Sequence, residues 1–342
     1  MPEVTRKRWP KIFGYSALVL VIVILLAITF TIGWRTFIGP RSRPLTNRTF
    51  ERTAARQERG RYIAENLAGC MDCHSPHDWT NHEAPISAGM LGAGQIFPLE
   101  GLPGTLTAAN LTPDPETGTG KWTDDQLERA IREGIGHDGR ALFPLMPYPN
   151  FKTMSDEDLA SVIVFLRSLP PVRNPLPPTK IIFPVKYLIR SVPEPLTAPV
   201  DDPDLSTPEK RGAHLVRIAS CADCHTPAKR GEPIPGLEFG GGTVFKGPWG
   251  EVASVNITPD ASGISYYDEA LFIQMMRTGY VHARKLNPIM PWSAFRGLTD
   301  EDLKSIFAYL RTLKPVNHHV DNTETPRFCK LCGSSHGLGD HN

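Results

Sequence analysis

The chain has 342 residues, and 37 Lys and Arg residues nearly balance 36 Asp and Glu residues, for a formal net charge of +1. This charge, without a basic patch rich in aromatic residues, argues against a nucleic-acid partner. The length suffices for two domains. The 29 Gly and 33 Pro residues favour short helices joined by turn-rich loops. Alternating strand patterns are scarce, so we predict a mainly α fold.

An uncharged apolar run covers residues 12–33 and follows a basic N-terminus. A helix over this run would be about 33 Å long at about 1.5 Å per residue, which is enough to cross a bilayer. A cleaved signal peptide is the competing interpretation, but its apolar core is about 7–15 residues long and ends at small residues. This run ends at Gly33-Trp34. We therefore predict a retained transmembrane anchor over residues 1–34.

Residues 35–53 are predicted to be a tether. From Ala54 to about Leu67 the apolar spacing predicts an amphipathic helix, which leads into Cys70-Met-Asp-Cys-His74. A second helix is expected from Pro208, because Pro at the first helical position after a hydroxyl residue is a start signal. That helix leads into Cys221-Ala-Asp-Cys-His225.

The C-x-x-C-H pattern is typical of haem c attachment. Its two thiols add to the two vinyl groups of one porphyrin, and the imidazole that follows lies under the iron as the proximal ligand. A bare C-x-x-C would also fit a disulfide, a zinc site or a redox dithiol, but a His follows in both copies. The sequence therefore predicts two covalently bound haem c groups, one held by Cys70, Cys73 and His74 and the other by Cys221, Cys224 and His225.

The repeat continues beyond these motifs. Each copy has an Asn-x-Thr-Pro-Asp segment, a short helix ending at Gly, a Pro-x-Met-Pro segment and a closing helix that begins at Ser or Thr. The matching segments are 110–114 and 256–260, 126–134 and 270–279, 144–147 and 288–291, and the helices after Ser155 and Thr299. We predict two copies of one helical domain, residues 54–172 and 207–316. A Pro-rich linker, residues 173–206, joins them, and its centre is apolar enough to pack on a domain surface.

A sixth iron ligand must come from elsewhere in each copy. Met146 and Met290 occupy the same position in both, within an extended Pro-x-Met-Pro segment from which a thioether can reach the iron. The alternative role is a core Met. His137 and His282 also match and compete for the iron, and His/His ligation would lower the reduction potential relative to His/Met. We favour Met. The unmatched His77, His82 and His214 are predicted to lie on the surface, as are His318 and His319.

Residues 317–342 form a tail rich in Cys and His. Cys329 and Cys332 are followed by Gly, so they do not form a third haem motif, and His336 and His341 complete four zinc-compatible ligands. A small disulfide is the alternative in an extracytoplasmic setting. A reduced, unstructured tail is the third interpretation.

The two copies resemble class I c-type cytochrome domains. Asn110-Leu-Thr-Pro-Asp114, Gly136-His-Asp-Gly-Arg140 and Met146-Pro-Tyr-Pro149 resemble the cytochrome c subunits of membrane-bound alcohol and gluconate dehydrogenases. The second copy lacks the His-Asp-Gly-Arg form. The resemblance covers about residues 55–316, although those subunits typically carry three haem domains. It implies that a small residue of the first helix crosses an aromatic residue of the last helix, as Gly60 would cross Phe165 and Gly212 would cross Tyr309.

The sequence thus predicts a membrane-anchored dihaem cytochrome c that transfers single electrons and is not itself an enzyme. Because haem c is attached after export, we expect a single-pass protein of the bacterial cytoplasmic membrane with its haem domains on the periplasmic side. Its expected partners are redox proteins: a dehydrogenase, a quinol-oxidising complex or a terminal oxidase. The alternatives are a dihaem cytochrome c peroxidase-like enzyme, which requires an open sixth iron position, and a metal-sensing or assembly module built on the tail.

Overall fold

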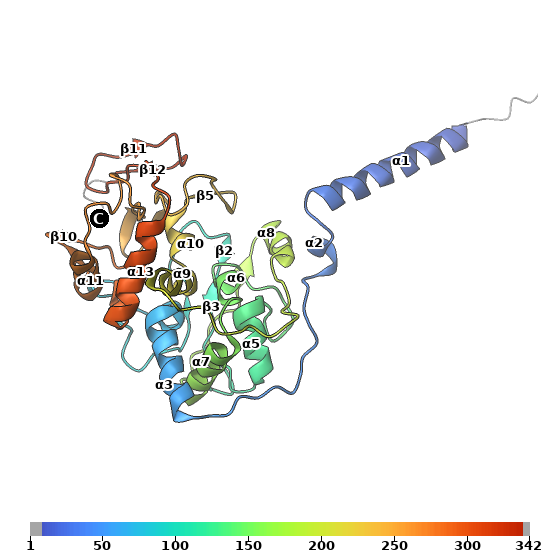
Figure 1. The fold of residues 1–342 in the computed structure, drawn as a ribbon. Coiled ribbons are helices and arrows are strands. Elements are labelled where there is room, and N and C mark those ends of the chain that lie inside the picture. The colour runs from blue at the N-terminus through green and yellow to red at the C-terminus, as the bar shows by residue number, and fades with distance from the viewer. Residues whose placement is uncertain (1–8, 338–342) are drawn as a thin grey trace, which may run out of the picture.

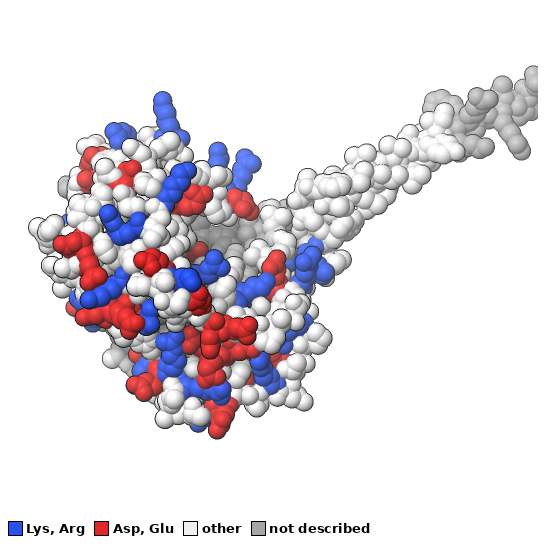
Figure 2. Space-filling view, in the orientation of Figure 1, with Lys and Arg blue, Asp and Glu red and all other residues white. Residues whose placement is uncertain are grey.

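One long apolar helix projects from a helix-rich body. The computed structural model describes residues 9–337, and α1 (Trp9–Phe30) extends away from the rest of the chain (Figure 1). By length and composition, Ile12–Phe30 is able to cross a membrane. Charged side chains of both signs cover the visible face of the body, whereas α1 is almost uncharged (Figure 2).

The body consists of short helices and two-stranded antiparallel sheets. The helices of its first half are α2 (Arg35–Ile38), α3 (Ala54–Tyr62), the π-helix η1 (Ile63–Leu67), α4 (Cys70–Cys73), α5 (Asp124–Glu133), α6 (Tyr148–Phe151) and α7 (Asp156–Ser168). The linker adds α8 (Val185–Leu188) and the 3-10 helix η2 (Ile189–Ser191). The second half contains α9 (Pro208–Ile218), α10 (Cys221–His225), α11 (Glu269–Thr278), α12 (Trp292–Phe295) and α13 (Asp300–Thr312).

The strands form short hairpins and bridges, not a central sheet. The pairs are β1 (Gln95–Ile96) with β3 (Thr107–Ala108), β2 (Gly104–Thr105) with β4 (Lys180–Ile181), β5 (Ala228–Lys229) with β6 (Glu232–Pro233), β7 (Val244–Gly247) with β8 (Gly250–Ala253), β9 (Tyr280–Val281) with β10 (Arg284–Lys285), and β11 (Arg327–Phe328) with β12 (Ser335–His336). The β2–β4 pair joins the apolar centre of the linker to the first half, as its composition predicted.

Local capping explains where the predicted helices begin and end. Thr123 and Gln126 cap α5 reciprocally, and Gly134 ends it in the left-handed region at φ 70°. The hydroxyls of Ser155 and Thr299 accept hydrogen bonds from backbone N–H groups three residues later, at the starts of α7 and α13. The helices expected from the sequence are therefore confirmed, within one to three residues at each end.

Each half is organised around two helices that cross at a glycine. A Cβ on Gly60 would lie 1.9 Å from the carbonyl oxygen of Ser161 and 2.9 Å from Cβ of Phe165, so α3 and α7 are in backbone contact. Gly212 lies as close to α13, where an added Cβ would be 2.7 Å from Cβ of Tyr309. Both predicted crossings are confirmed. The apolar side chains of the two helix pairs merge into one continuous hydrophobic core.

Polar contacts also join the two halves. The hydroxyl of Tyr62 on α3 donates a short hydrogen bond to the carboxylate of Asp302 on α13, and it accepts one from the backbone N–H of Thr299 at 3.0 Å. Arg296 and Glu83 form an ion pair at 2.8 Å. The start of α13 is thus held directly against the first half.

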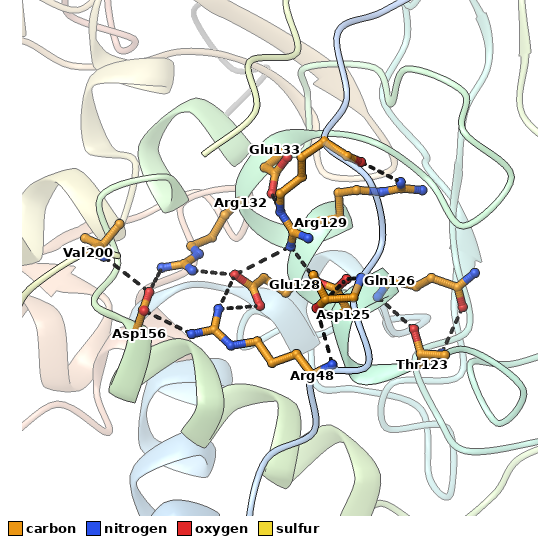
Figure 3. Close-up of polar contacts among 12 residues, drawn as sticks. Arg48, Thr123, Asp125, Gln126, Glu128, Arg129, Arg132, Glu133, Asp156 and Val200 are labelled. Atoms are coloured by element: carbon orange, nitrogen blue, oxygen red, sulfur yellow. Dashed lines mark hydrogen bonds and ion pairs between the residues drawn. The ribbon is translucent and has the colours of Figure 1, made fainter. Parts of the chain in front are cut away.

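The predicted tether, residues 35–53, is bound along the first half. Arg43 contacts Asp125 at 2.5 Å and Glu133 at 2.7 Å, and both carboxylates are fully buried. Arg48 reaches Glu128 at 2.9 Å. The carboxylate of Glu128 also pairs with Arg132 of the same helix at 2.7 Å, which extends the network (Figure 3).

This network sets the ionisation of the buried carboxylates. Burial acts to raise the pKa of Asp125, but hydrogen bonds from Arg43 and from the backbone N–H of Thr46 outweigh it and lower that pKa below its ordinary value. Burial raises the pKa of Glu133 despite its contact with Arg43. Arg43 therefore favours the charged state of both carboxylates, and for Asp125 it does so together with Thr46.

We expect Gly60→Ala to destabilise the fold, because its new methyl group would push α3 away from α7. A loss of about 1–3 kcal/mol is typical of such overpacking. Thermal unfolding followed by circular dichroism measures the loss, and Glu58→Ala, on an exposed position of α3, is the control. Equal melting temperatures for Gly60→Ala and the control would contradict the close crossing.

We expect Arg43→Ala to lower the free energy of unfolding by about 3 kcal/mol, because it leaves two buried carboxylates without their partner. Limited proteolysis within residues 35–53 should accelerate, and Arg41→Ala, at an exposed position, should change neither quantity. The folded-state pKa of Asp125 is lowered, so its contribution is present above the unfolded value of about 3.9 and is lost as the pH falls. If the free energy of unfolding of Arg43→Ala fell with decreasing pH as much as that of the parent protein, this assignment would be contradicted.

Candidate haem-binding site

Both C-x-x-C-H motifs occupy a short helix that follows a sharp turn. Gly69 precedes α4 at φ 62°, and Ser220 precedes α10 at φ 56°, so each chain turns through the left-handed region before the first Cys. The helical turn then places the two thiols of each motif on one side of the chain, followed by the imidazole. The predicted attachment residues are thus grouped in the same way in both halves.

The two imidazoles make the same hydrogen bond. Nδ1 of His74 lies 2.7 Å from the carbonyl oxygen of Ala109, and Nδ1 of His225 lies 2.7 Å from that of Val255. A carbonyl only accepts, so Nδ1 carries the proton and donates it. Among the described residues, Nε2 of neither ring has a hydrogen-bond partner, and its lone pair is available to a metal. Burial lowers the pKa of both rings, which favours this neutral form.

An asparagine holds each accepting carbonyl in place. Oδ1 of Asn110 accepts hydrogen bonds from the N–H and the hydroxyl of Thr112, while Nδ2 donates to the carbonyl oxygen of Val172 at 2.7 Å. Asn256 repeats these bonds with Thr258 and Val316, also at 2.7 Å for the latter. The Asn-x-Thr-Pro-Asp segments therefore connect the loop beside each imidazole to the chain that leaves the closing helix.

The thiols are not poised for redox chemistry. Burial raises the pKa of Cys70, Cys221 and Cys224 to about 12, and it raises the pKa of Cys73 as well. A redox dithiol needs a lowered thiol pKa. Yet none of the four residues is fully shielded from solvent, and Cys224 is exposed. These properties fit thioether attachment to a porphyrin better than a catalytic dithiol.

The two predicted Met ligands lie in matching turns. The N–H of Tyr148 donates to the carbonyl oxygen of Met146 at 2.8 Å, and the N–H of Trp292 donates to that of Met290 at 2.7 Å. Both Met side chains are partly buried against the core. The aromatic ring after each Met lies against the glycine that ends the preceding helix, Gly134 in the first half. The same packing therefore places both Met turns.

The other histidines divide into several classes. The two competitors, His137 and His282, are exposed. The prediction that His77 lies on the surface is wrong, because its side chain is only 3% exposed and binds backbone carbonyls through both nitrogens. His82 and His214 are half-buried, not on the surface. The ring of His82 packs against those of Tyr280 and Trp292, which no local sequence signal indicates.

The two motifs lie near one another. Burial raises the pKa of Cys73, with smaller contributions from Asp72, Cys70 and Cys224. Asn150, four residues after Met146, donates hydrogen bonds to Ser220 at 3.1 Å and to the carboxylate of Asp223 at 3.1 and 3.2 Å. The Met turn of the first half therefore contacts the second C-x-x-C-H motif directly.

The tail brings together a different ligand set from the predicted one. Cys329, Cys332 and His336 converge with His318, and their potential ligand atoms all lie within 4.8 Å of one another. His318 is 1% exposed, so its predicted surface position is wrong, whereas His319 is exposed as expected. The predicted fourth ligand, His341, lies outside the described residues.

Comparison with known proteins agrees with this geometry. Residues 209–314 match the cytochrome c family model. This chain contains a cytochrome c domain. A domain of this family implies covalently bound haem c, and the residues of the second half fit it: two adjacent thiols followed by an imidazole whose Nε2 is unengaged.

Relatives extend the likeness beyond the matched domain. The chain is 31% identical to a nicotinate dehydrogenase subunit of Pseudomonas putida over 92% of this chain and 25% of the relative. It is 28% identical to the cytochrome c subunit of the quinone alcohol dehydrogenase of Gluconobacter oxydans over 76% of this chain and 55% of the relative. It is also 28% identical to a diheme cytochrome c-type protein of Cereibacter sphaeroides over 72% of this chain and 83% of the relative.

The predicted resemblance to dehydrogenase cytochrome subunits is therefore confirmed. The chain spans about a quarter of the first of these relatives and about half of the second. The carbonyl groups of Ala109 and Val255 and the side chains of Asn110 and Asn256 were not predicted as site residues. The repeated Asn-x-Thr-Pro-Asp segment is the available signal, but by itself it indicates only a repeat.

Proposed function

We propose that the chain is a dihaem cytochrome c with two tandem class I domains, residues 54–172 and 207–316. In this proposal Cys70, Cys73 and His74 hold one haem, and Cys221, Cys224 and His225 hold the other. The observation that carries it is the hydrogen bond at 2.7 Å from Nδ1 of each proximal His to a backbone carbonyl, made identically in both halves. That bond fixes the ring and presents Nε2 to the iron.

Met146 and Met290 are the proposed sixth ligands. Their matching turns and partial burial support this role, and the exposure of His137 and His282 argues against the competing role for the histidines. Bound haem supplies reversible one-electron exchange at its iron. If Met146 and Met290 complete the coordination of the iron, no position would remain for peroxide, and this disfavours the peroxidase-like alternative.

The two haem sites form one electron path in this proposal. The hydrogen bonds from Asn150 to Ser220 and to Asp223 of the second motif support a short separation between them. The shared hydrophobic core packs the two halves against each other. Haem groups held by Cys70, Cys73 and His74 and by Cys221, Cys224 and His225 would exchange single electrons within one packed body.

We place the chain at the bacterial cytoplasmic membrane as a single-pass protein with its haem domains on the periplasmic side. The apolar, exposed α1 supports the anchor. Exposed apolar side chains next to it extend this surface: Phe37 and Ile38 of α2, and Phe183, Tyr187 and Leu188 in the linker. Arg190 joins these two segments through a hydrogen bond to the carbonyl of Thr36 at 3.2 Å.

The proposed donor is a substrate-oxidising dehydrogenase, because named relatives are a dehydrogenase subunit and an alcohol dehydrogenase cytochrome subunit. In this arrangement the chain accepts electrons from the dehydrogenase and releases them to a membrane or periplasmic acceptor. Mass spectrometry of proteins that co-purify from native membranes in mild detergent tests this partner. Recovery of a quinol-oxidising complex or a terminal oxidase, without a dehydrogenase, would contradict it.

We expect a substitution in one C-x-x-C-H motif to affect only the haem group attached to that motif. Purified parent protein should carry two haem groups per chain by haem absorbance against protein mass. Cys73→Ser and Cys224→Ser should each lose one thioether bond, on different peptides, in peptide mass spectrometry. A parent protein with only one modified peptide would contradict the dihaem proposal.

We expect Met146→Ala to lower the reduction potential of one haem, because removal of the thioether ligand weakens stabilisation of the ferrous form. It should also open the iron to exogenous ligands such as cyanide. His137→Ala is the matched control and should leave the redox titration and cyanide binding unchanged. If His137→Ala produced these effects and Met146→Ala did not, the axial assignment would be reversed.

A further inference from the structure

Four potential metal ligands meet in the tail, away from both haem motifs. They are His318, Cys329, Cys332 and His336, and their ligand atoms lie within 4.8 Å of one another. His318, Cys332 and His336 are only 1%, 7% and 5% exposed. The β11–β12 hairpin that carries the later ligands lies at the opposite side of the body from α1 (Figure 1).

The orientation of the two imidazoles suits metal binding. Nδ1 of His318 lies 2.9 Å from the carbonyl oxygen of Gly240, so it donates there, and Nε2 lies 3.3 Å from Sγ of Cys329. Nε2 of His336 is buried and has no hydrogen-bond partner among the described residues. A buried ring nitrogen without a partner costs free energy unless a ligand satisfies it.

The backbone places the two cysteines at the tip of the hairpin. The N–H of Cys329 donates to the carbonyl oxygen of Ser334 at 2.9 Å, and the N–H of Gly333 donates to that of Cys329 at 3.0 Å. Gly333 adopts φ 73°, which lets the chain reverse immediately after Cys332. Both cysteines are free thiols, and the turn directs them to the same side as the two histidines.

We propose that these four side chains bind one zinc ion with tetrahedral geometry. Two Cys and two His are a typical ligand set for structural zinc, and bonds of about 2.0–2.3 Å give ligand-to-ligand distances of roughly 3.3–3.8 Å. The separation of 3.3 Å between His318 and Cys329 already matches such an edge. The hydrogen bond from Nδ1 of His318 to Gly240 is the outer contact that orients a zinc-bound imidazole.

The zinc ion would fasten the tail to the loop behind the second haem motif. A Cβ on Gly242 would lie 2.7 Å from the ring of His318, so the loop is in contact with the cluster. The N–H of the neighbouring Gly241 donates to the carbonyl oxygen of His225 at 2.7 Å. The site therefore stabilises the second half, and no ligand position is left open for catalysis.

Elemental analysis of the purified full-length protein tests the proposal. We expect one zinc ion per chain in addition to the haem iron, retained through dialysis against a weak chelator. His318→Ala and Cys332→Ser should lose the zinc. The neighbouring His319→Ala is the matched control and should retain it, since His319 is exposed and pairs with Glu324 at 2.9 Å. Circular dichroism reports whether each variant has folded.

A second measurement on the parent protein keeps the test independent of variant folding. Alkylation of Cys329 and Cys332, followed by peptide mass spectrometry, should be slow until a strong chelator removes the metal, and removal should lower the melting temperature. A parent protein that lacks zinc, or that carries a Cys329–Cys332 disulfide, would overturn the proposal. So would equal zinc content in His318→Ala and His319→Ala.

Discussion

The arrangement of each half depends on one hydrogen bond, from a histidine Nδ1 to a backbone carbonyl. Ala109 and Val255 supply these carbonyls at 2.7 Å. Each is held by the asparagine that follows it, which binds the chain just after the closing helix. The closing helix in turn crosses the helix that delivers the C-x-x-C-H motif. The imidazole ring of each half is therefore fixed through a closed circuit of contacts, and loss of one of the hydrogen bonds would leave buried polar groups unpaired at a cost of about 1–3 kcal/mol each.

The two halves share this circuit of contacts, but a different neighbouring segment of the chain packs on each half. In the first half, residues 35–53 cross α5 and neutralise its buried carboxylates with Arg43 and Arg48. In the second half, the tail crosses the β7–β8 region, where Asn322 bonds both backbone groups of Ala253. Residues 35–53 contact the first half through ion pairs, whereas the tail contacts the second half through a Cys/His cluster. Each repeat is thus completed by a segment that has no equivalent in its partner.

Much of the fold follows from sequence signals that are local or repeated. The helix caps Ser155 and Thr299, and the glycines that permit helix crossing, have side-chain or backbone requirements that can be identified without coordinates. The carbonyls beside His74 and His225 have no such signature, because every residue has a carbonyl group. His318 was missed for a different reason: it belongs to no motif, and only the reversal of the tail brings it to Cys329. The contact of Arg43 with α5 joins residues far apart in sequence, where no periodicity relates them.

The central claim is that two haem sites lie close together in one packed body. Electron paramagnetic resonance of the fully oxidised protein tests it most directly, with the double variant Cys221→Ser/Cys224→Ser as the single-haem reference. Two neighbouring ferric haems should shorten each other's relaxation times and broaden each other's signals. The spectrum of the parent should therefore differ from the sum of two independent haem signals. A parent spectrum equal to the sum of two isolated haems, with unchanged relaxation, would contradict the account.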